Sequence, residues 1–545
     1  MSAPATPAPH ATDSPPDDGH PSPTAAEARR VIFAASLGTV FEWYDFYLYG
    51  SLAVFFGGLF FPPGNATAGL LASLATFGAG FAVRPFGALV FGRLGDLIGR
   101  KYTFLVTILL MGLSTALVGV LPTYASIGLW APAALVSLRL VQGLALGGEY
   151  GGAATYVAEH APPGRRGRDT AWIQTTATLG FFLSLAVILA TRVGLGEAAF
   201  RAWGWRVPFL ISLVLLAVSL YIRLRLRESP VFAALKAQGK TSKRPLAESF
   251  AEWPNLRIVL VALFGLTAGQ GVVWYAGQFY ALYFLQNTLK VPYRDSYVLV
   301  AAALLIGTPF FLVFGRLSDR VGRKWIMMAG CLLGALTFVP IFRQITHYAN
   351  PALEAAAARA PVVVHGGDDG TPGAAFLTRR GVPYARVDGA AGPGWATVGG
   401  ERLAAFDSAA YTAALARAGY PAVADTARMN KPMTLLLLTV LMLYVTMVYG
   451  PIAAYLVELF PTRIRYTSMS LPYHLGNGWF GGFLPLIAEW RVVATGDIYA
   501  GLHYPIAVAL MTFVLGSLFL RETRDADLRD DRGAPDAARG EAPPA

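Results

Sequence analysis

The sequence is poor in charge and nearly free of cysteine. Its 545 residues contain one cysteine, Cys331, and charged side chains make up 14% of them. A single thiol excludes a disulfide framework and a cysteine-based metal site. The low charge, with 55% hydrophobic residues and a mean hydropathy of +0.48, excludes an ordinary soluble domain. We therefore expect most of the chain to lie in a lipid bilayer.

The sequence also lacks the patterns of enzymes and nucleotide-driven pumps. It has no His-Glu-x-x-His pattern, no cluster of metal ligands and no nucleophile beside a base. Its one trace of a phosphate-binding loop, Gly239-Lys240-Thr241, lacks the glycine five residues before Gly239. A membrane-embedded enzyme is therefore the disfavoured alternative, and we expect neither a metal nor a cofactor.

Long apolar runs recur along nearly the whole chain. A helix needs about 20 residues to cross the ~30 Å hydrocarbon core. Lys and Arg follow the second, fourth and sixth runs, whereas the loops after the first and third runs contain neither. Basic loops stay in the cytoplasm, so we expect both termini there and attribute the net charge of +11 to orientation, not to nucleic-acid binding. The twelve runs begin near Val31, Gly69, Thr103, Ala131, Ala171, Trp205, Ile258, Val298, Trp325, Met433, Thr467 and Leu502.

The remaining segments define the expected organisation. The two ends, rich in Ala and Pro, read as disordered tails. The expected parts are a tail at 1–28, a six-helix bundle at 29–225, a cytoplasmic linker at 226–257, a second six-helix bundle at 258–522 and a tail at 523–545.

An insert at about 347–431 interrupts the second bundle on its extracytoplasmic side. Pro361 to Val364 predicts a strand, and Asp407 to Arg417 predicts a short helix. We expect a tolerated surface insertion, with a lid or a partner-binding role as the alternative.

One loop motif occurs in both halves. Residues 91–101 and 314–324 are identical at eight of eleven positions, and each copy joins the second and third run of its half. A second echo, Glu159 with Pro162 and Glu458 with Pro461, ends the fourth run of each half. Such a repeat indicates two related bundles. Its charged residues predict a network that holds the cytoplasmic side closed; they are Asp96, Arg100 and Glu159 in the first half and Asp319, Arg323 and Glu458 in the second.

This motif resembles the loop signature Gly-x-x-x-Asp-x-x-Gly-Arg-Lys of the major facilitator superfamily. Residues 41–47 in the first run, and 139–143 with 147–152 in the fourth, look like its metabolite:proton symporter branch, which includes carriers of 2-oxoglutarate, citrate, shikimate, proline and betaine. The resemblance covers residues 30–345 and 433–522 but not the insert. It implies an all-α membrane protein with twelve transmembrane helices in two six-helix bundles, the major facilitator fold.

Charged residues within the runs are candidate functional groups, because burying a charge in a bilayer is costly. Glu42 and Asp45 lie one turn apart on the first helix, and with Glu149 they are the proton-coupling candidates, Asp45 being preferred. Arg139 shares a helix face with Gln142 and Glu149, and Arg84 adds a second cation. A guanidinium can bind a carboxylate through two parallel hydrogen bonds, so these arginines are candidates for binding a carboxylate-bearing substrate. Internal salt bridges between these arginines and acids are the competing explanation.

Further polar and aromatic residues are expected to line the same cavity. Tyr44 accompanies the acids of the first helix, and Trp274 with Tyr275 echoes Trp43 with Tyr44 at the start of the second half. The remaining substrate-binding candidates are Gln278, His474 and Asn477.

These features predict a secondary transporter of a small carboxylate-bearing metabolite, driven by the proton gradient and working by alternating access. A proton symporter of a zwitterion such as proline or betaine is the alternative, since Trp43, Tyr44, Tyr47, Trp274 and Tyr275 offer aromatic faces to a quaternary ammonium. A channel, and exchange without protons, are weaker alternatives. We expect a monomer in the plasma membrane of a bacterium, with lipid, the small-molecule substrate and H⁺ as its partners.

Overall fold

The structure is a computed structural model that describes residues 25–63, 66–98, 100–148, 150–162, 164–224, 244–366, 372–387, 394–404, 406–461, 463–526 and 528. The first half is a group of long helices with short connecting pieces. Its elements are α1 (Ala25–Phe60), α2 (Ala66–Ala82), α3 (Arg84–Ile98), α4 (Arg100–Val120), α5 (Tyr124–Ile127), α6 (Trp130–Gly147), α7 (Tyr150–His160), α8 (Arg166–Leu195), α9 (Glu197–Ala199), η1 (Phe200–Gly204) and α10 (Arg206–Leu224).

The second half repeats this order after a short helix, α12 (Pro245–Phe250). Several of its crossings contain π-helical turns, which often mark functional sites. Its membrane elements are α13 (Trp253–Ala262), η2 (Leu263–Thr267), α14 (Ala268–Tyr275), η3 (Ala276–Tyr280), α15 (Ala281–Tyr283), η4 (Phe284–Thr288), α16 (Tyr293–Val321), α17 (Lys324–Ala349), α21 (Lys431–Tyr449), α22 (Ile452–Leu459), α23 (Arg465–Leu475), η5 (Gly476–Gly481), α24 (Leu484–Thr495), η6 (Ala500–Leu502) and α25 (His503–Phe519).

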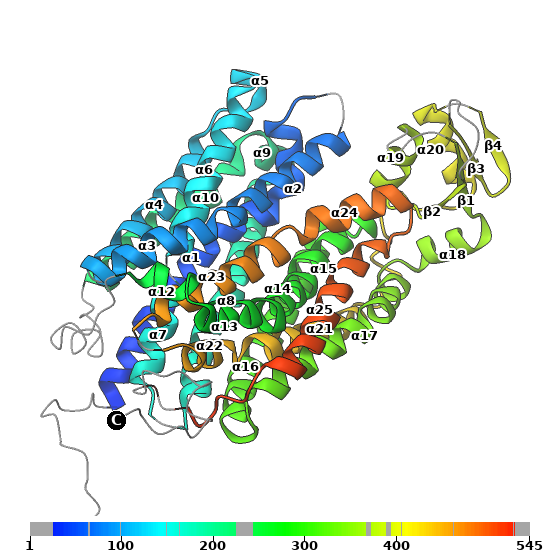
Figure 1. The fold of residues 1–545 in the computed structure, drawn as a ribbon. Helices are drawn as coiled ribbons and strands as arrows, with labels where there is room; N and C mark the ends of the chain where they lie inside the picture. Colours follow the sequence, from blue (N-terminus) through cyan, green and yellow to red (C-terminus); the bar gives the residue numbers. More distant parts are fainter. Residues whose placement is uncertain are drawn as a thin grey trace, which may run out of the picture.

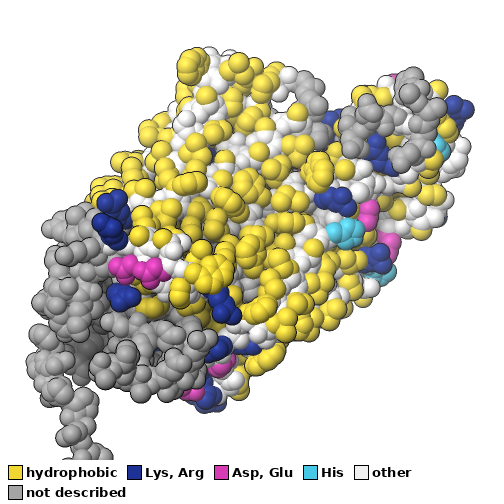
Figure 2. Space-filling model, viewed as in Figure 1, with side chains coloured by type: hydrophobic (Ala, Val, Ile, Leu, Met, Phe, Trp, Pro, Cys, Tyr) yellow, Lys and Arg dark blue, Asp and Glu magenta, His cyan; other side chains and the backbone are white. Residues whose placement is uncertain are grey.

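These elements form twelve crossings. In the described residues, eight helical segments are long and apolar enough to span a bilayer, and a bent pair at 197–221 makes a ninth. The other three are α1, α4 and the broken α23–α24 segment. Figure 2 shows hydrophobic side chains covering the helical body, with charged groups gathered near its two ends. Exposed residues such as Leu117, Val214 and Leu336 belong to this lipid-facing surface.

The two halves meet along two seams. Helix α8 packs against α16 on one side, and α2 and α3 pack against η5, α23 and α24 on the other. Glycines permit close approach along these helices. A Cβ on Gly315 would lie 2.6 Å from the Gly167 carbonyl oxygen, and one on Gly478 would lie 2.8 Å from that of Phe81.

Proline and glycine set the breaks that position polar residues. Pro85 occupies the second position of α3, where its missing N–H is tolerated, and the chain turns at Val83 just before it. This break places Arg84 at the start of a new helix in the interior. Gly450 and Pro451 separate α21 from α22 in the same manner.

The insert is a small α/β unit, of which the sequence predicted one strand and one helix. It lies at one end of the second half (Figure 1). Strand order in its sheet is β2-β1-β3-β4, with β1 parallel to β2 and the other pairs antiparallel. The elements are α18 (Pro351–Arg359), β1 (Val362–His365), α19 (Pro372–Arg379), β2 (Tyr384–Val387), β3 (Trp395–Val398), β4 (Glu401–Leu403) and α20 (Ser408–Arg417).

The predicted strand and helix of the insert are present as β1 and α20. The Asp407 side chain caps α20 by accepting a hydrogen bond from the Ala409 N–H.

Several predicted boundaries need correction. Helix α17 continues to Ala349, so the insert begins later than 347. Helix α1 begins at Ala25, inside the expected disordered tail, and α12 and α13 lie inside the expected linker. Residues 225–243 and most of both predicted tails lie outside the described residues.

Candidate functional site

Two buried acids lie on α1 near the middle of the molecule. Glu42 and Asp45 are 3% and 5% exposed. Asp45 faces the Thr115 hydroxyl on α4, and its Oδ1 has no hydrogen-bond partner among the described residues. Asp45 is therefore a buried carboxyl group with Thr115 as its described side-chain contact. The third predicted acid, Glu149, lies outside the described residues.

Arg84 enters this interior at the α2–α3 break. Its side chain is fully buried, and its guanidinium carbon lies 3.9 Å from the centre of the Phe81 ring and 4.2 Å from that of Phe46. Its Nε and Nη2 atoms have no hydrogen-bond partner in the described part of the chain. Aromatic faces stabilise the charge in part, and two donors remain for a ligand.

Arg139 presents a second guanidinium from α6. It is also fully buried, and its carbon lies 4.4 Å from the centre of the same Phe46 ring. Its Nη1 donates to Gln142 Oε1 at 2.6 Å, and Gln142 Nε2 donates to Thr115 Oγ1 at 2.8 Å. Nε and Nη2 are again without a partner within the described ranges. This chain of contacts fixes the orientation of Arg139 on the side of the centre where Asp45 lies.

Asp45 Oδ1 and the Nε and Nη2 atoms of both arginines have no hydrogen-bond partner among the described residues, so the structure shows no pairing of Asp45 through these atoms. A buried cation without a partner anion is costly. Within the described residues, each guanidinium keeps two N–H groups, Nε and Nη2, without a hydrogen-bond partner.

Aromatic residues from both halves form a stack beside these cations. Tyr47 stacks between Trp43 and Trp274, with ring centres 5.2 Å and 5.4 Å apart. Tyr275 packs edge-on against Phe81, with ring centres 5.2 Å apart.

Gln278 and Tyr44 were both predicted to bind the substrate, but they make different kinds of contact. Gln278 donates to Thr178 Oγ1 at 3.4 Å and keeps a buried Oε1 without a partner among the described atoms. Tyr44 is the exception to the predicted group: its hydroxyl donates to the Pro208 carbonyl on α10 at 2.7 Å, so it packs between two helices of the first half.

The two polar residues predicted on α23 and η5 also differ. His474 is buried, and neither ring nitrogen has a hydrogen-bond partner within the described residues. Asn477 instead exchanges two hydrogen bonds with Gln270 of α14, at 2.9 Å and 3.0 Å. This reciprocal amide pair joins two helices of the second half, so Asn477 has a structural partner.

Sequence reasoning missed several contacts of the centre. Thr115 appears in the sequence only as a small polar residue in an apolar run, yet it contacts both Gln142 and Asp45. Tyr449 shares a 2.6 Å hydroxyl contact with Tyr473, whose ring stacks on Tyr150 at 3.5 Å between centres. Polar residues facing one another from separate helices carry no local sequence signal.

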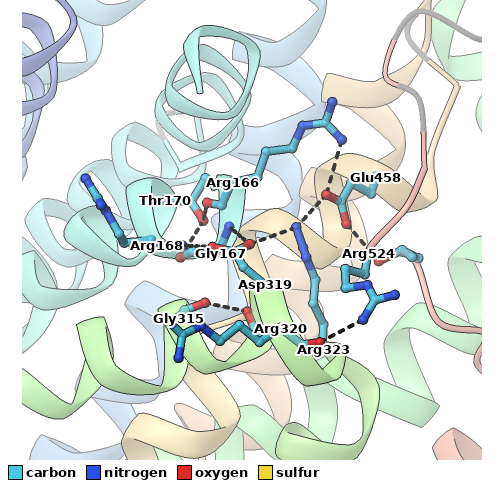
Figure 3. A network of polar contacts seen from close by, with 12 residues as sticks. Arg166, Gly167, Arg168, Thr170, Gly315, Asp319, Arg320, Arg323, Glu458 and Arg524 are labelled. Carbon is cyan, nitrogen blue, oxygen red and sulfur yellow. Dashed lines mark hydrogen bonds and ion pairs between the residues drawn. The ribbon is translucent and has the colours of Figure 1, made fainter. Parts of the chain in front are cut away.

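The second copy of the loop motif forms a polar network between the halves (Figure 3). Asp319 accepts hydrogen bonds from the backbone N–H groups of Gly167, at 2.7 Å, and Arg168, at 2.9 Å, at the start of α8. Arg323 donates to Glu458 Oε1 at 2.7 Å and lies 3.4 Å from Asp319 Oδ1. The three predicted gate residues of the second half therefore lie together, and Asp319 binds the start of α8 in the first half.

The first copy of the motif is only partly described. Glu159 forms an ion pair with Arg465 of the other half at 3.6 Å, and the Tyr466 hydroxyl donates to the Gly148 carbonyl. The side chains of Asp96 and Arg100 lie outside the described residues.

A segment after the last helix reinforces the network, although it was predicted to be disordered from 523 on. Glu522 accepts hydrogen bonds from the backbone N–H groups of Arg323 and Lys324, at 2.9 Å and 3.1 Å. Thr523 donates to Glu458 Oε2 at 2.9 Å, and Arg166 donates to the Ala526 carbonyl at 2.7 Å. The acid that follows the last apolar run was the available sequence signal.

Contacts between the halves lie on both sides of the central residues. The polar network seals the end that carries the loop motifs, here called the motif side. On the opposite end, the insert side, Phe279 stacks on Phe181 at 4.4 Å and contacts Tyr47 at 5.1 Å. Beyond this aromatic layer a cavity of about 820 Å³ opens toward the insert, and neither Arg84 nor Arg139 lines it. The centre and the outer cavity are thus separate spaces.

Comparisons with known proteins agree with this architecture. Residues 31–257 match the family model described as sugar (and other) transporter. The glycine betaine/proline/ectoine/pipecolic acid transporter OusA of Dickeya dadantii (strain 3937) is 30% identical over 92% of this chain and 85% of its own length. The alpha-ketoglutarate permease of Escherichia coli (strain K12) is 36% identical over 60% of this chain and 75% of its own.

A solved structure shares the fold. It is the proton:xylose symporter XylE bound to 6-bromo-6-deoxy-D-glucose, 16% identical, with a TM-score of 0.62 over 93% of this chain and 98% of that one. The predicted membrane architecture is confirmed, and so is the expectation that the protein is a transporter and not an enzyme. The chain therefore belongs to the major facilitator superfamily of membrane transporters.

Proposed function

We propose that this protein is a proton-coupled symporter of the metabolite:proton branch that carries a small solute bearing a carboxylate. The observation that carries the proposal is the pair of buried guanidiniums, Arg84 and Arg139. Each keeps Nε and Nη2 without a hydrogen-bond partner in the described structure, and Nε with one Nη forms the edge that grips a carboxylate through two parallel bonds.

The solute would complete the charge balance of the centre. An anion between the arginines removes the cost of burying cations in a bilayer. Because both guanidiniums lie over Phe46, a dicarboxylate is able to engage one cation with each end. The alpha-ketoglutarate permease, named for such a dicarboxylate, is among the relatives of this chain.

Asp45 is the proposed proton carrier. It is buried on α1 beside Thr115, which links it to Gln142 and Arg139. Protonation changes the charge of the centre by one unit next to the groups that hold the substrate. Substrate binding and proton binding then affect each other's free energy, which is what coupling requires.

Alternating access would follow from the two seams between the halves. The network of Asp319, Arg323 and Glu458 holds the motif side closed, and opening it must release these bonds. The positive loops support a cytoplasmic position for the motif side and both termini, with the insert facing the other compartment. We further propose that the protein works as a monomer in a bacterial inner membrane.

A zwitterionic osmolyte such as proline or betaine is the second candidate. The stack of Trp43, Tyr47 and Trp274 provides aromatic faces near the arginines, and such faces attract a quaternary ammonium. OusA, a betaine and proline carrier by name, matches this chain over most of its length. A zwitterion would use one arginine for its carboxylate and the aromatic stack for its cationic end.

The test is uptake of a labelled panel into proteoliposomes with an imposed inward proton gradient. The panel contains 2-oxoglutarate, citrate, shikimate, proline and betaine, and Arg139→Gln is compared with Arg428→Gln, an exposed control whose side chain is 75% accessible. Uptake of a carboxylate solute that Arg139→Gln abolishes and Arg428→Gln retains supports the proposal. Unchanged uptake by Arg139→Gln would contradict it.

A further inference from the structure

The outer cavity on the insert side is built from both the membrane helices and the insert. Its volume is about 820 Å³. The wall from the first half includes Ser51 and Phe55 of α1, and the insert contributes Thr378, Arg379, Gly381 and Val382. The inserted unit therefore forms part of the wall of this cavity.

The insert is fixed against this cavity by backbone contacts. The Ala424 N–H donates to the Lys290 carbonyl at 3.0 Å, and the Tyr384 N–H donates to the Gly496 carbonyl at 3.1 Å. Arg386 donates to the Ala494 carbonyl at 3.1 Å. These bonds hold Arg379, at the end of α19, over the cavity.

The charges of the lining are predominantly positive. Four cationic side chains line the cavity, and Glu489 is the only acid among its described lining residues. Two of the cations, Arg192 and Arg201, contact Glu197 at 2.7 Å and 2.8 Å. The other two are Lys290 and Arg379. A concave surface with an excess of one charge sign raises the local concentration of ions of the opposite sign.

Uncharged hydrogen-bond donors also line the cavity. Gln286 and Asn287 of η4 line the cavity, and the amide nitrogens of both are buried with no hydrogen-bond partner in the described part of the chain. Buried donors of this kind usually have a partner in proteins. An anion with carboxylate oxygens would satisfy them and the cations together.

We propose that this cavity is a second, outer binding site for small carboxylate anions, with Lys290 of the α15–α16 connection and Arg379 of the insert as its principal cations. The site rests on the proposed function, because it supplies the solute that the central arginines take up. Phe279, Phe181 and Tyr47, which contact one another, do not line the cavity, and neither do Arg84 and Arg139. The insert is then a selectivity element.

The sole native cysteine makes a direct test practical, because Cys331 is only 1% exposed. Thr378→Cys places a thiol in the cavity. The rates of its reaction with a negatively charged sulfonatoethyl methanethiosulfonate and a positively charged trimethylammonioethyl methanethiosulfonate are then compared in the purified full chain. We expect the anionic reagent to gain about tenfold in relative rate over a free thiol standard.

Two variants test whether Lys290 and Arg379 cause the preference for the anionic reagent. Lys290→Gln and Arg379→Gln, each in the Thr378→Cys background, should each lower this rate ratio several-fold, whereas Arg428→Gln on the exposed face of the insert should not change it. Millimolar 2-oxoglutarate should slow labelling by the anionic reagent. A ratio equal to that of the free thiol, or one that neither variant alters, would overturn the proposal.

The pH dependence gives an independent readout. Burial lowers the pKa of Lys290 to about 8, against the attraction of Glu489 on α24 and with the help of Arg380 in the insert. Raising the pH from 7 to 9 should therefore lower the anion preference in the Lys290 protein and leave it nearly constant in Lys290→Arg. An equal loss in both would show that Lys290 does not supply the charge. Labelling needs no transport, so it can fail or succeed separately from the uptake test.

Discussion

The geometry of the two buried arginines depends on the guanidinium group and not on charge alone. Arg139 uses Nη1 to hold Gln142 and leaves Nε and Nη2 toward the centre. A lysine keeps the charge but loses this planar edge. We expect Arg139→Lys to raise the KM for the transported carboxylate about tenfold, because one charge-assisted hydrogen bond is worth at least ~1.4 kcal/mol.

Saturation curves of uptake in proteoliposomes measure this effect. Arg402→Lys, on the insert and outside both sites, is the matched control. An unaltered KM in Arg139→Lys would mean that the substrate does not use the bidentate edge.

The lowered pKa of Lys290 predicts that the stability of the folded protein depends on pH. Its pKa is lowered from 10.5 to about 8 by burial. Between these values the unfolded chain binds more protons than the folded chain, so stability rises as the pH rises through this window. The unfolding temperature of wild type should therefore rise relative to that of Lys290→Gln between pH 7.5 and pH 10. A difference that stays constant with pH would contradict the buried position of the ammonium.

At the scale of elements, the start of α8 makes one of the contacts that join the halves on the motif side. Asp319 accepts two hydrogen bonds there, and its charge strengthens both. Asp319→Asn keeps the size of the side chain but weakens these bonds by about 1.5–3 kcal/mol. We expect the motif side to open in a larger fraction of molecules.

Distances between spin labels at exposed Arg93 and Val321 report this opening by double electron–electron resonance. The distribution in Asp319→Asn should gain a longer component that wild type lacks. Asp425→Asn, which removes an exposed acid of the insert, should match wild type, and an identical distribution in Asp319→Asn would argue against the gate.

Docking of the insert depends on a glycine. Gly381 has φ of +68°, and a Cβ there would lie 1.9 Å from the Thr288 carbonyl oxygen. Gly381→Ala should displace α19 and speed hydrogen exchange across 372–387. Gly400 also has positive φ, at +89°, but has open space around it. Gly400→Ala therefore separates backbone strain from the clash, and equal exchange in the two variants would exclude the clash as the cause.

At the scale of the whole molecule, the sequence predicted the parts that repeat or that a bilayer demands. Apolar runs reveal membrane helices because every crossing must satisfy its backbone internally, and two copies of one motif reveal two halves. Of the insert sheet only β1 was predicted, because the other strands are three or four residues long, as β4 is, and carry little pattern. Tyr44 was misplaced because sequence spacing gives a helix face but not the neighbour that the face meets.

The central claim is that proton movement is coupled to the solute through Asp45, and Asp45→Asn tests it most directly. Two activities of one proteoliposome preparation are compared: accumulation of the identified solute driven by an inward proton gradient, and exchange of labelled for unlabelled solute without a gradient. We predict that the variant loses accumulation and retains exchange, because the centre still binds solute but no longer carries the proton. Gradient-driven accumulation equal to wild type in Asp45→Asn would contradict the account.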